Sequence, residues 1–215
     1  MKTLIAIPCM DMVHTIFMKS LLAMDKVGEY SFGISASSLV YDARNGLAKK
    51  AVSEGYDRVL WLDSDMDFAP DLMKRLSARL DEGRELVSAL YFTRKAPVKP
   101  NIFISCGYYH DKNTDEVTPA AVNYWEYPKD DIFPIAACGF GGVMMTTDLI
   151  NRIGEKFGLP FSPILGFGED LSFCSRAADL GVEMFCDSSI KMGHVGLGTI
   201  TEDIYLAQGE KHGRH

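Results

Sequence analysis

Three carboxylates follow an apolar run at alternate positions in the stretch Val59–Asp67. The run Val59–Leu62 is short, rich in β-forming residues and followed by turn-forming residues, which predicts a buried strand. A buried carboxylate without a partner loses its hydration, so Asp63, Asp65 and Asp67 must lie where the strand leaves its sheet. The side chains of Asp63 and Asp65 share one face if the chain stays extended, and a divalent cation between them would relieve their repulsion.

The same carboxylates have a second interpretation, an Asp-rich loop that leads into the next helix. Pro70 suits the first turn of that helix, and Asp67 lies close enough before it to act at the helix entry. An Asp-x-Asp pattern alone is a frequent chance match. Its place at the end of an apolar strand favours the metal site, because ligands of open α/β sheets bind at the carboxyl ends of the strands.

Alternating strands and helices are predicted for the first half of the chain. Compact apolar runs predict four strands, at Thr3–Ile7, Tyr30–Ser35, Val59–Leu62 and Glu85–Phe92. Helical spacing of apolar residues predicts three helices, at residues 16–24, at 39–54 and between Pro70 and Gly83. This alternation predicts an α/β fold with βαβ units and a mostly parallel sheet.

The chain changes character between Ala96 and Ile135, where prolines and aromatic residues cluster. Short runs at Asn101–Ser105 and Ala121–Trp125 predict antiparallel strands or hairpins. The aromatic side chains there either offer flat faces to ligands such as sugar rings or cover a core.

Two helices and two strands are predicted in the remainder, and one of these strands ends the glycine-rich stretch Cys138–Met145. One helix begins at Thr146 or Thr147 and the other follows Gly168. The last predicted strand is Val182–Cys186, and the polar tail from Gln208 to the end of the chain is predicted to fray.

Other residues in these segments could also carry chemistry. Arg44 lies near the amino end of a predicted helix. It could bind a phosphate through two hydrogen bonds, or it could be a solvated arginine on an exposed face. Gly141 and Gly142 allow either close approach of a ligand to the backbone or a bend where two strands cross. His194 lies between glycines and is either a metal ligand or a structural histidine.

Glu169 and Asp170 are predicted to begin a helix. One interpretation is that they complement the positive end of the helix dipole. The other is that one of them is a general base at the rim of a pocket, where a carboxylate can take a proton from a hydroxyl group.

Composition limits the function classes. The 215 residues suit one domain, and the hydrophobic share of 47% is typical of a globular protein. A net charge of -7 argues against an extended nucleic-acid surface. The sequence shows no signal peptide and no transmembrane stretch. Five cysteines at scattered spacings predict reduced thiols in a cytoplasmic protein and argue against a zinc site.

Four motifs, in this order, resemble those of nucleotide-sugar-dependent glycosyltransferases of the GT-A fold, particularly family 2-like bacterial and phage members. They are Ala43–Asn45, Asp63–Asp65 as the DXD motif, Gly168–Asp170 as the "ED" motif, and the late His194. The resemblance covers roughly residues 3–196. One departure is a compact region between the DXD and ED motifs, without a membrane or amphipathic extension after it, and this leaves the acceptor open.

The resemblance implies a single GT-A domain over residues 1–215, with a Rossmann-like, mostly parallel sheet flanked by helices and a smaller antiparallel portion in the second half. Residues 1–95 would hold the nucleotide, residues 96–200 would shape the acceptor pocket, and residues 201–215 would form a tail. The implied reaction moves a sugar from a nucleoside-diphosphate sugar to a hydroxyl group with inversion, although the sequence leaves retention open. The acceptor could be a glycan, a lipid, a nucleic-acid base or a small molecule; the sequence names neither the sugar, the nucleotide base nor the oligomeric state.

The resemblance also assigns metal ligands. Asp65 would be the principal ligand of a divalent metal and His194 a second, while Asp63 would touch the ribose, the metal or a metal-bound water. Mixed oxygen and imidazole ligands favour manganese over calcium, with magnesium as an alternative.

The remaining roles follow from the same resemblance. Asp170 would deprotonate the attacking hydroxyl group and Glu169 would bind the acceptor. Arg44 would contact the nucleotide or its phosphates, and Ser64, Gly141 and Gly142 complete the expected substrate-binding set.

Two other functions fit parts of the pattern. A nucleotidyltransferase on a related sheet usually needs a glycine-rich, basic loop after its first strand, and residues 8–14 contain neither glycine nor lysine nor arginine. A binding module without catalytic activity would hold a nucleotide or a divalent ion, but it would have no need of a base such as Asp170.

Overall fold

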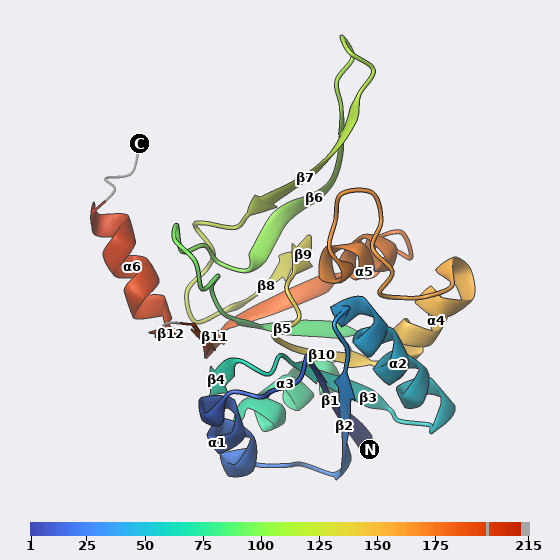
Figure 1. The fold of residues 1–215 in the computed structure, drawn as a ribbon, viewed down its shortest axis with the longest axis vertical. Helices are drawn as coiled ribbons and strands as arrows, with labels where there is room; N and C mark the ends of the chain where they lie inside the picture. The colour runs from blue at the N-terminus through green and yellow to red at the C-terminus, as the bar shows by residue number, and fades with distance from the viewer. Residues whose placement is uncertain (197, 212–215) are drawn as a thin grey trace.

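The computed structural model describes residues 1–196 and 198–211 and shows helices on both faces of a central sheet (Figure 1). In the first half of the chain the elements are β1 (Lys2–Cys9), α1 (Thr15–Ala23), β2 (Glu29–Ala36), α2 (Val40–Ser53), β3 (Arg58–Leu62), β4 (Met66–Phe68), α3 (Leu72–Asp81) and β5 (Leu86–Leu90). The predicted strands and helices of this half are all present, and the short strand β4 is an addition.

The second half alternates less regularly. Its elements are β6 (Ile102–His110), β7 (Val117–Asn123), β8 (Ile132–Ile135), β9 (Ala137–Cys138), β10 (Gly142–Thr146), α4 (Thr147–Phe157), α5 (Glu169–Ala178), β11 (Met184–Val195), β12 (Thr199–Ile200) and α6 (Glu202–Lys211). Thr146 is the N-cap of α4, where its side chain accepts a hydrogen bond from the amide of Leu149, as its residue type predicts.

Within the described residues the central sheet has nine strands, seven of them in the order β12-β11-β5-β10-β3-β1-β2. Strand β1 pairs in parallel with β2 and with β3, and β5 pairs in parallel with β11. Strand β10 lies antiparallel between β3 and β5. The mainly parallel sheet is therefore confirmed, with β10 reversed at its centre and with the short strands β4, β8 and β12 antiparallel to β11.

The strands of this sheet bury both faces. On β1, Leu4 packs in the cluster beneath α2, α4 and α5, whereas the next residue, Ile5, packs beneath α1 and α3. On β3, Trp61 and Leu60 divide between the two clusters in the same way. A strand that is buried on both faces is apolar at every position, which is why its sequence forms an unbroken apolar run.

A second sheet, in the order β7-β6-β9, confirms the antiparallel portion. Its β6–β7 hairpin projects from the body as a long arm (Figure 1). The arm is held against the segment before α5, because the hydroxyl of Tyr108 donates a hydrogen bond to the carbonyl of Leu165 at 3.1 Å. Gly166 has φ +79°, and a Cβ there would lie 2.3 Å from Pro119, so this contact requires glycine.

The last long strand differs from its prediction. Strand β11 continues to Val195, well beyond the predicted end at Cys186. Its register on β5 shifts between Asp187 and Lys191. This irregularity interrupts the apolar pattern from which a strand is predicted. His194 consequently lies in a strand and is paired with β4 and β12.

Two predictions at the start of α3 need correction. Helix α3 begins at Leu72 with Asp71 as its N-cap residue, so Pro70 precedes the helix and does not lie in its first turn. The helix-entry role predicted for Asp67 is wrong for the same reason. Asp67 lies in β4, where its carboxylate accepts a hydrogen bond from Ser20 at 2.8 Å.

The tail also differs from its prediction. Gln208 belongs to α6, which begins at Glu202, and residues 212–215 of the predicted frayed tail lie outside the described residues. The carboxylate of Glu202 accepts hydrogen bonds from Tyr127 at 2.7 Å and from Lys129 at 3.1 Å. Among the described residues, no helix has the length and apolar character needed to span a bilayer.

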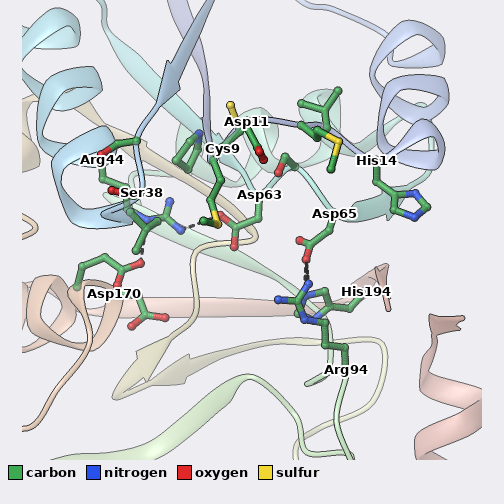
Figure 2. A pocket seen from close by; sticks show the side chains of 18 of the residues that line it. Cys9, Asp11, His14, Ser38, Arg44, Asp63, Asp65, Arg94, Asp170 and His194 are labelled. Carbon is green, nitrogen blue, oxygen red and sulfur yellow. Dashed lines mark hydrogen bonds and ion pairs between the residues drawn. The ribbon is translucent and has the colours of Figure 1, made fainter. Parts of the chain in front are cut away.

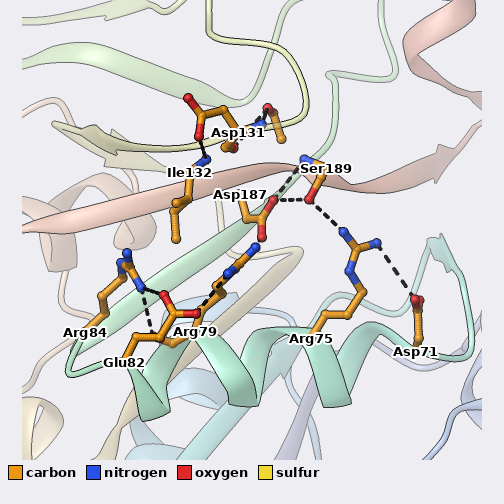
Figure 3. A network of polar contacts seen from close by, with 10 residues as sticks. Asp71, Arg75, Arg79, Glu82, Arg84, Asp131, Ile132, Asp187 and Ser189 are labelled. Atoms are coloured by element: carbon orange, nitrogen blue, oxygen red, sulfur yellow. Dashed lines mark hydrogen bonds and ion pairs between the residues drawn. The ribbon is translucent and has the colours of Figure 1, made fainter.

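The irregular part of β11 is held by a polar network with α3 (Figure 3). The carboxylate of Asp187, only 1% exposed, accepts hydrogen bonds from Arg79 at 2.7 Å and from the amide of Ser189 at 3.0 Å. We predict that Asp187→Ala lowers the free energy of unfolding by about 2 kcal/mol, because it leaves these donors without their buried acceptor. Urea denaturation measures the loss.

The matched control is Lys74→Ala on the same helix. Lys74 is exposed and lies outside the network drawn in Figure 3, so its replacement should cost less than about 0.5 kcal/mol. Equal losses in the two variants would contradict a structural role for the network.

Candidate functional site

A cleft of about 820 Å³ opens where β1, β3 and β5 end (Figure 2). The side chains that line it come from the loop after β1, the start of α2, the turn after β3, the end of β5, the start of α5, and β11. They include most of the predicted site residues, namely Arg44, Asp63, Ser64, Asp65, Glu169, Asp170 and His194. Parallel strands thus bring residues from distant parts of the chain to one edge of the sheet.

Arg44 connects the two sides of this cleft. Its Nη2 lies 2.8 Å from Oδ1 of Asp63, and its Nε lies 3.2 Å from Oε1 of Glu169. The side chain is 2% exposed and packs near the rings of Trp61 and Phe140. The alternative that Arg44 is a solvated surface arginine is therefore wrong.

The charge of Arg44 is balanced by its carboxylate partners. Burial lowers the pKa of Arg44, but the charges of Asp63, Glu169 and Asp170 outweigh this effect and raise the pKa above its usual value. The guanidinium is thus a permanent buried cation, held by one carboxylate after β3 and another at the start of α5.

Asp170 lies in the first turn of α5, and its Oδ1 accepts a hydrogen bond from the amide of Leu171 at 2.8 Å. Burial raises the pKa of Asp170 to about 6, and the neighbouring charge of Glu169 contributes in the same direction. Arg44 opposes the increase. A carboxylate with a pKa near neutrality can take a proton from a hydroxyl group and release it again, as a general base must.

Asp65 and His194, which are far apart in the sequence, meet on the other side of the cleft (Figure 2). Nδ1 of His194 lies 2.9 Å from the carbonyl oxygen of Phe92, which can only accept a hydrogen bond, so Nδ1 carries a proton. Nε2 then faces Oδ2 of Asp65 at 3.4 Å. Their lone pairs repel each other unless a proton or a metal cation lies between them.

The pKa values of this pair agree with the geometry. Burial lowers the pKa of His194, but its contacts with Asp65 and with the carbonyl of Phe92 raise it above its usual value. Burial raises the pKa of Asp65, but His194 and Arg94 lower it below its usual value. Arg94 forms an ion pair with the same oxygen, Oδ2.

A divalent metal fits two of the three predicted ligands. A metal-binding histidine usually donates its other ring N–H to a carbonyl or a carboxylate, as Nδ1 of His194 does to the carbonyl of Phe92. Asp63 does not complete a three-residue cage, since its carboxylate is bound to Arg44, and no such cluster occurs among the described residues. Asp65 and His194 would hold the metal, with the remaining positions left to substrate oxygens or water.

The predicted glycines lie behind the cleft, and neither is among the described residues that line it. The amide of Gly141 donates a hydrogen bond to the hydroxyl of Tyr91 at 3.0 Å, and its carbonyl accepts one from the amide of Asp63 at 3.3 Å. A Cβ on Gly142 would lie 2.2 Å from the sulfur of Met192. These contacts match the interpretation as a bend between strands, which here positions Asp63.

Several residues in the cleft have no role in the sequence prediction. Tyr91 and Arg94 follow β5, Ser38 precedes α2, and Asn101 donates a hydrogen bond to the hydroxyl of Tyr91 at 2.5 Å. Burial raises the pKa of Tyr91 well above its usual value, so its hydroxyl stays protonated. The ends of the predicted strands were the only signal that could have indicated these positions.

The fold has counterparts among solved structures. The crystal structure of A197 from STIV matches with a TM-score of 0.62 and 20% identity, over 94% of this chain and 91% of that one. The crystal structure of GalNAc-T7 with UDP, GalNAc and Mn²⁺ matches with a TM-score of 0.57 and 12% identity, over 97% of this chain and 47% of that one. This chain therefore spans about half the length of the GalNAc-T7 chain.

These likenesses define the class of structure. The chain has a GT-A-like fold, a mixed α/β domain with a mainly parallel central sheet, flanking helices and a small antiparallel sheet. No family model matches the sequence, and no curated protein matches it.

The effect of Glu169 on the pKa of Asp170, its neighbour at the start of α5, can be tested by titration. We predict that Glu169→Gln lowers the pKa of Asp170 from its value of about 6, because the substitution removes a neighbouring negative charge while keeping an oxygen for Arg44. Carboxyl-carbon NMR of ¹³C-labelled aspartate measures the pKa. Glu155→Gln, an exposed position on α4, should leave it unchanged, and an equal shift in both variants would contradict the local effect.

Proposed function

We propose that this chain is a metal-dependent glycosyltransferase that moves a sugar from a nucleoside-diphosphate sugar to an acceptor hydroxyl group, with inversion at the anomeric carbon. The observation that carries the proposal is that one cleft is lined both by a pair of cation-binding side chains and by a carboxylate that can act as a base. One side holds the pair Asp65 and His194, which fits a cation, and the other holds Asp170, a carboxylate whose pKa is raised to about 6. The UDP, GalNAc and Mn²⁺ in the GalNAc-T7 structure agree with this class of ligand.

The donor side is assigned to the first half of the chain. Asp65 and His194 would hold a divalent ion, manganese or alternatively magnesium, and that ion would supply Lewis-acid stabilisation of the charge on the departing diphosphate. Asp63 is kept in place by Arg44 and is proposed to bind the ribose or a metal-bound water. Ser64, in the turn between the two aspartates, lines the donor side of the cleft.

The acceptor side is assigned to α5 and the segments around it. Asp170 takes the proton of the acceptor hydroxyl as that oxygen forms its bond to the anomeric carbon and the bond to the diphosphate breaks. Attack from the face opposite the leaving group inverts the configuration. Glu169 is held by Arg44 and is proposed to orient the acceptor.

We also propose a cytoplasmic location, because five cysteines at scattered spacings are typical of reduced thiols.

The cleft gives no support to a nucleotidyltransferase. Residues 8–15 line it at the end of β1 and just after it, where such an enzyme would place a glycine-rich basic loop, and they contain neither glycine nor lysine nor arginine.

The role of the base can be tested with a panel of nucleotide sugars in the presence of manganese. We predict that Asp170→Asn lowers turnover by at least about a hundredfold and leaves nucleotide affinity nearly unchanged. Asp179→Asn, at the other end of α5, should retain activity. A fully active Asp170→Asn variant would show that another group is the base.

The pH dependence follows from the same carboxylate. Asp170 must be deprotonated to act, and its pKa is raised to about 6, so turnover should rise with pH through about 6 and then level off. An acid limb centred near the usual range for aspartate, about 4, would contradict the assignment.

The metal site can be tested by calorimetry with UDP, with and without manganese. We predict that Asp65→Asn removes the manganese-dependent part of the affinity, because it removes the charged metal ligand. Asp148→Asn, an exposed residue of α4, should behave as the wild type. Equal UDP affinity with and without manganese in the wild type would refute the metal role.

A further inference from the structure

Two arginines line the cleft and differ in how firmly they are held. Arg44 is 2% exposed and is held by two carboxylates. Arg94 is 50% exposed, and its ion pair is with Asp65. Arg94 can therefore change partners at little cost in desolvation, whereas Arg44 cannot.

The loop that carries Arg94 is anchored behind the guanidinium. The amide of Thr93 donates a hydrogen bond to the carbonyl of Lys99 at 2.9 Å, and the amide of Lys99 donates one to the side chain of Thr93 at 3.0 Å. A Cβ on Gly196 would lie 3.4 Å from Cβ of Arg94, so the base of the side chain packs against that turn. The base is thus fixed, and the charged end reaches across to the aspartate (Figure 2).

One carboxylate oxygen is shared in this arrangement. Oδ2 of Asp65 is paired with Nη1 of Arg94 and lies 3.4 Å from Nε2 of His194. A metal cation bound to this oxygen and this nitrogen would lie beside the guanidinium. Two cations in contact in a partly buried site repel each other strongly, so both cannot stay on Asp65.

We propose that Arg94 and the divalent metal compete for Asp65, and that Arg94, once displaced, binds the diphosphate of the donor. The proposal rests on the metal site of the proposed function. The displaced guanidinium lines the same cleft and matches phosphate oxygens in geometry and charge. Metal alone must then displace Arg94 without compensation, whereas metal with a diphosphate gives Arg94 a new partner. Binding of the two is therefore mutually favourable.

The test compares Arg94→Gln with Lys95→Gln, which removes the same charge from the neighbouring exposed position outside the cleft. Manganese binding without nucleotide is followed by the loss of the electron paramagnetic resonance signal of free Mn²⁺. Pyrophosphate binding in saturating manganese is followed by calorimetry. Asp65→Asn is included to report on the metal site itself.

We expect Arg94→Gln to bind manganese at least about fivefold more tightly than Lys95→Gln and to bind pyrophosphate at least about fivefold more weakly. A general structural defect would not move the two affinities in opposite directions. Unchanged manganese affinity in Arg94→Gln, with binding lost in Asp65→Asn, would overturn the competition and leave the metal site intact. Unchanged manganese binding in Asp65→Asn would overturn both the competition and the proposed metal site.

Discussion

The buried guanidinium of Arg44 is the interaction on which the cleft depends. An unpaired buried cation is too costly to keep, so Arg44 requires carboxylates on both of its sides. Asp63 and Glu169 supply them from 19 and 125 residues away. The ion pairs join α2, the end of β3 and the start of α5, and they hold the proposed donor and acceptor sides in one fixed relation.

The central sheet makes this convergence achievable. Strands β1, β3, β5 and β11 run in the same direction, so the segments that follow them lie at one edge. The reversed strand β10 fills the centre and lets the bend before it support Asp63 through the carbonyl of Gly141. The shift in β11, held by Asp187 and Arg79, sets the register in which His194 continues past β5 to pair with β4.

The two sides of the cleft use burial in opposite ways. Burial raises the pKa of Asp170, so this carboxylate can exchange a proton near neutrality. At Asp65, neighbouring positive charges outweigh burial, so this carboxylate stays ionised and keeps its attraction for cations. Arg44 lies beside the first group and Arg94 beside the second, one fixed and one exposed. Asp65 and Asp170 are the same type of residue, but their surroundings give them different chemistry.

Much of the fold and part of the candidate site could be predicted from the sequence. Apolar runs marked the strands of the first half, because strands buried on both faces admit few polar residues, and acidic residues after Leu62 had to lie at a strand end because burial would strip their hydration. The sequence also marked Asp170 at a helix start. Only the tertiary structure decided that Arg44 is buried, that β11 continues to His194, and that Arg94 shares an oxygen of Asp65. Those outcomes depend on partners that are far away in the chain. The free energy of an ion pair or of a strand register depends on both partners, so it cannot be inferred from either segment alone.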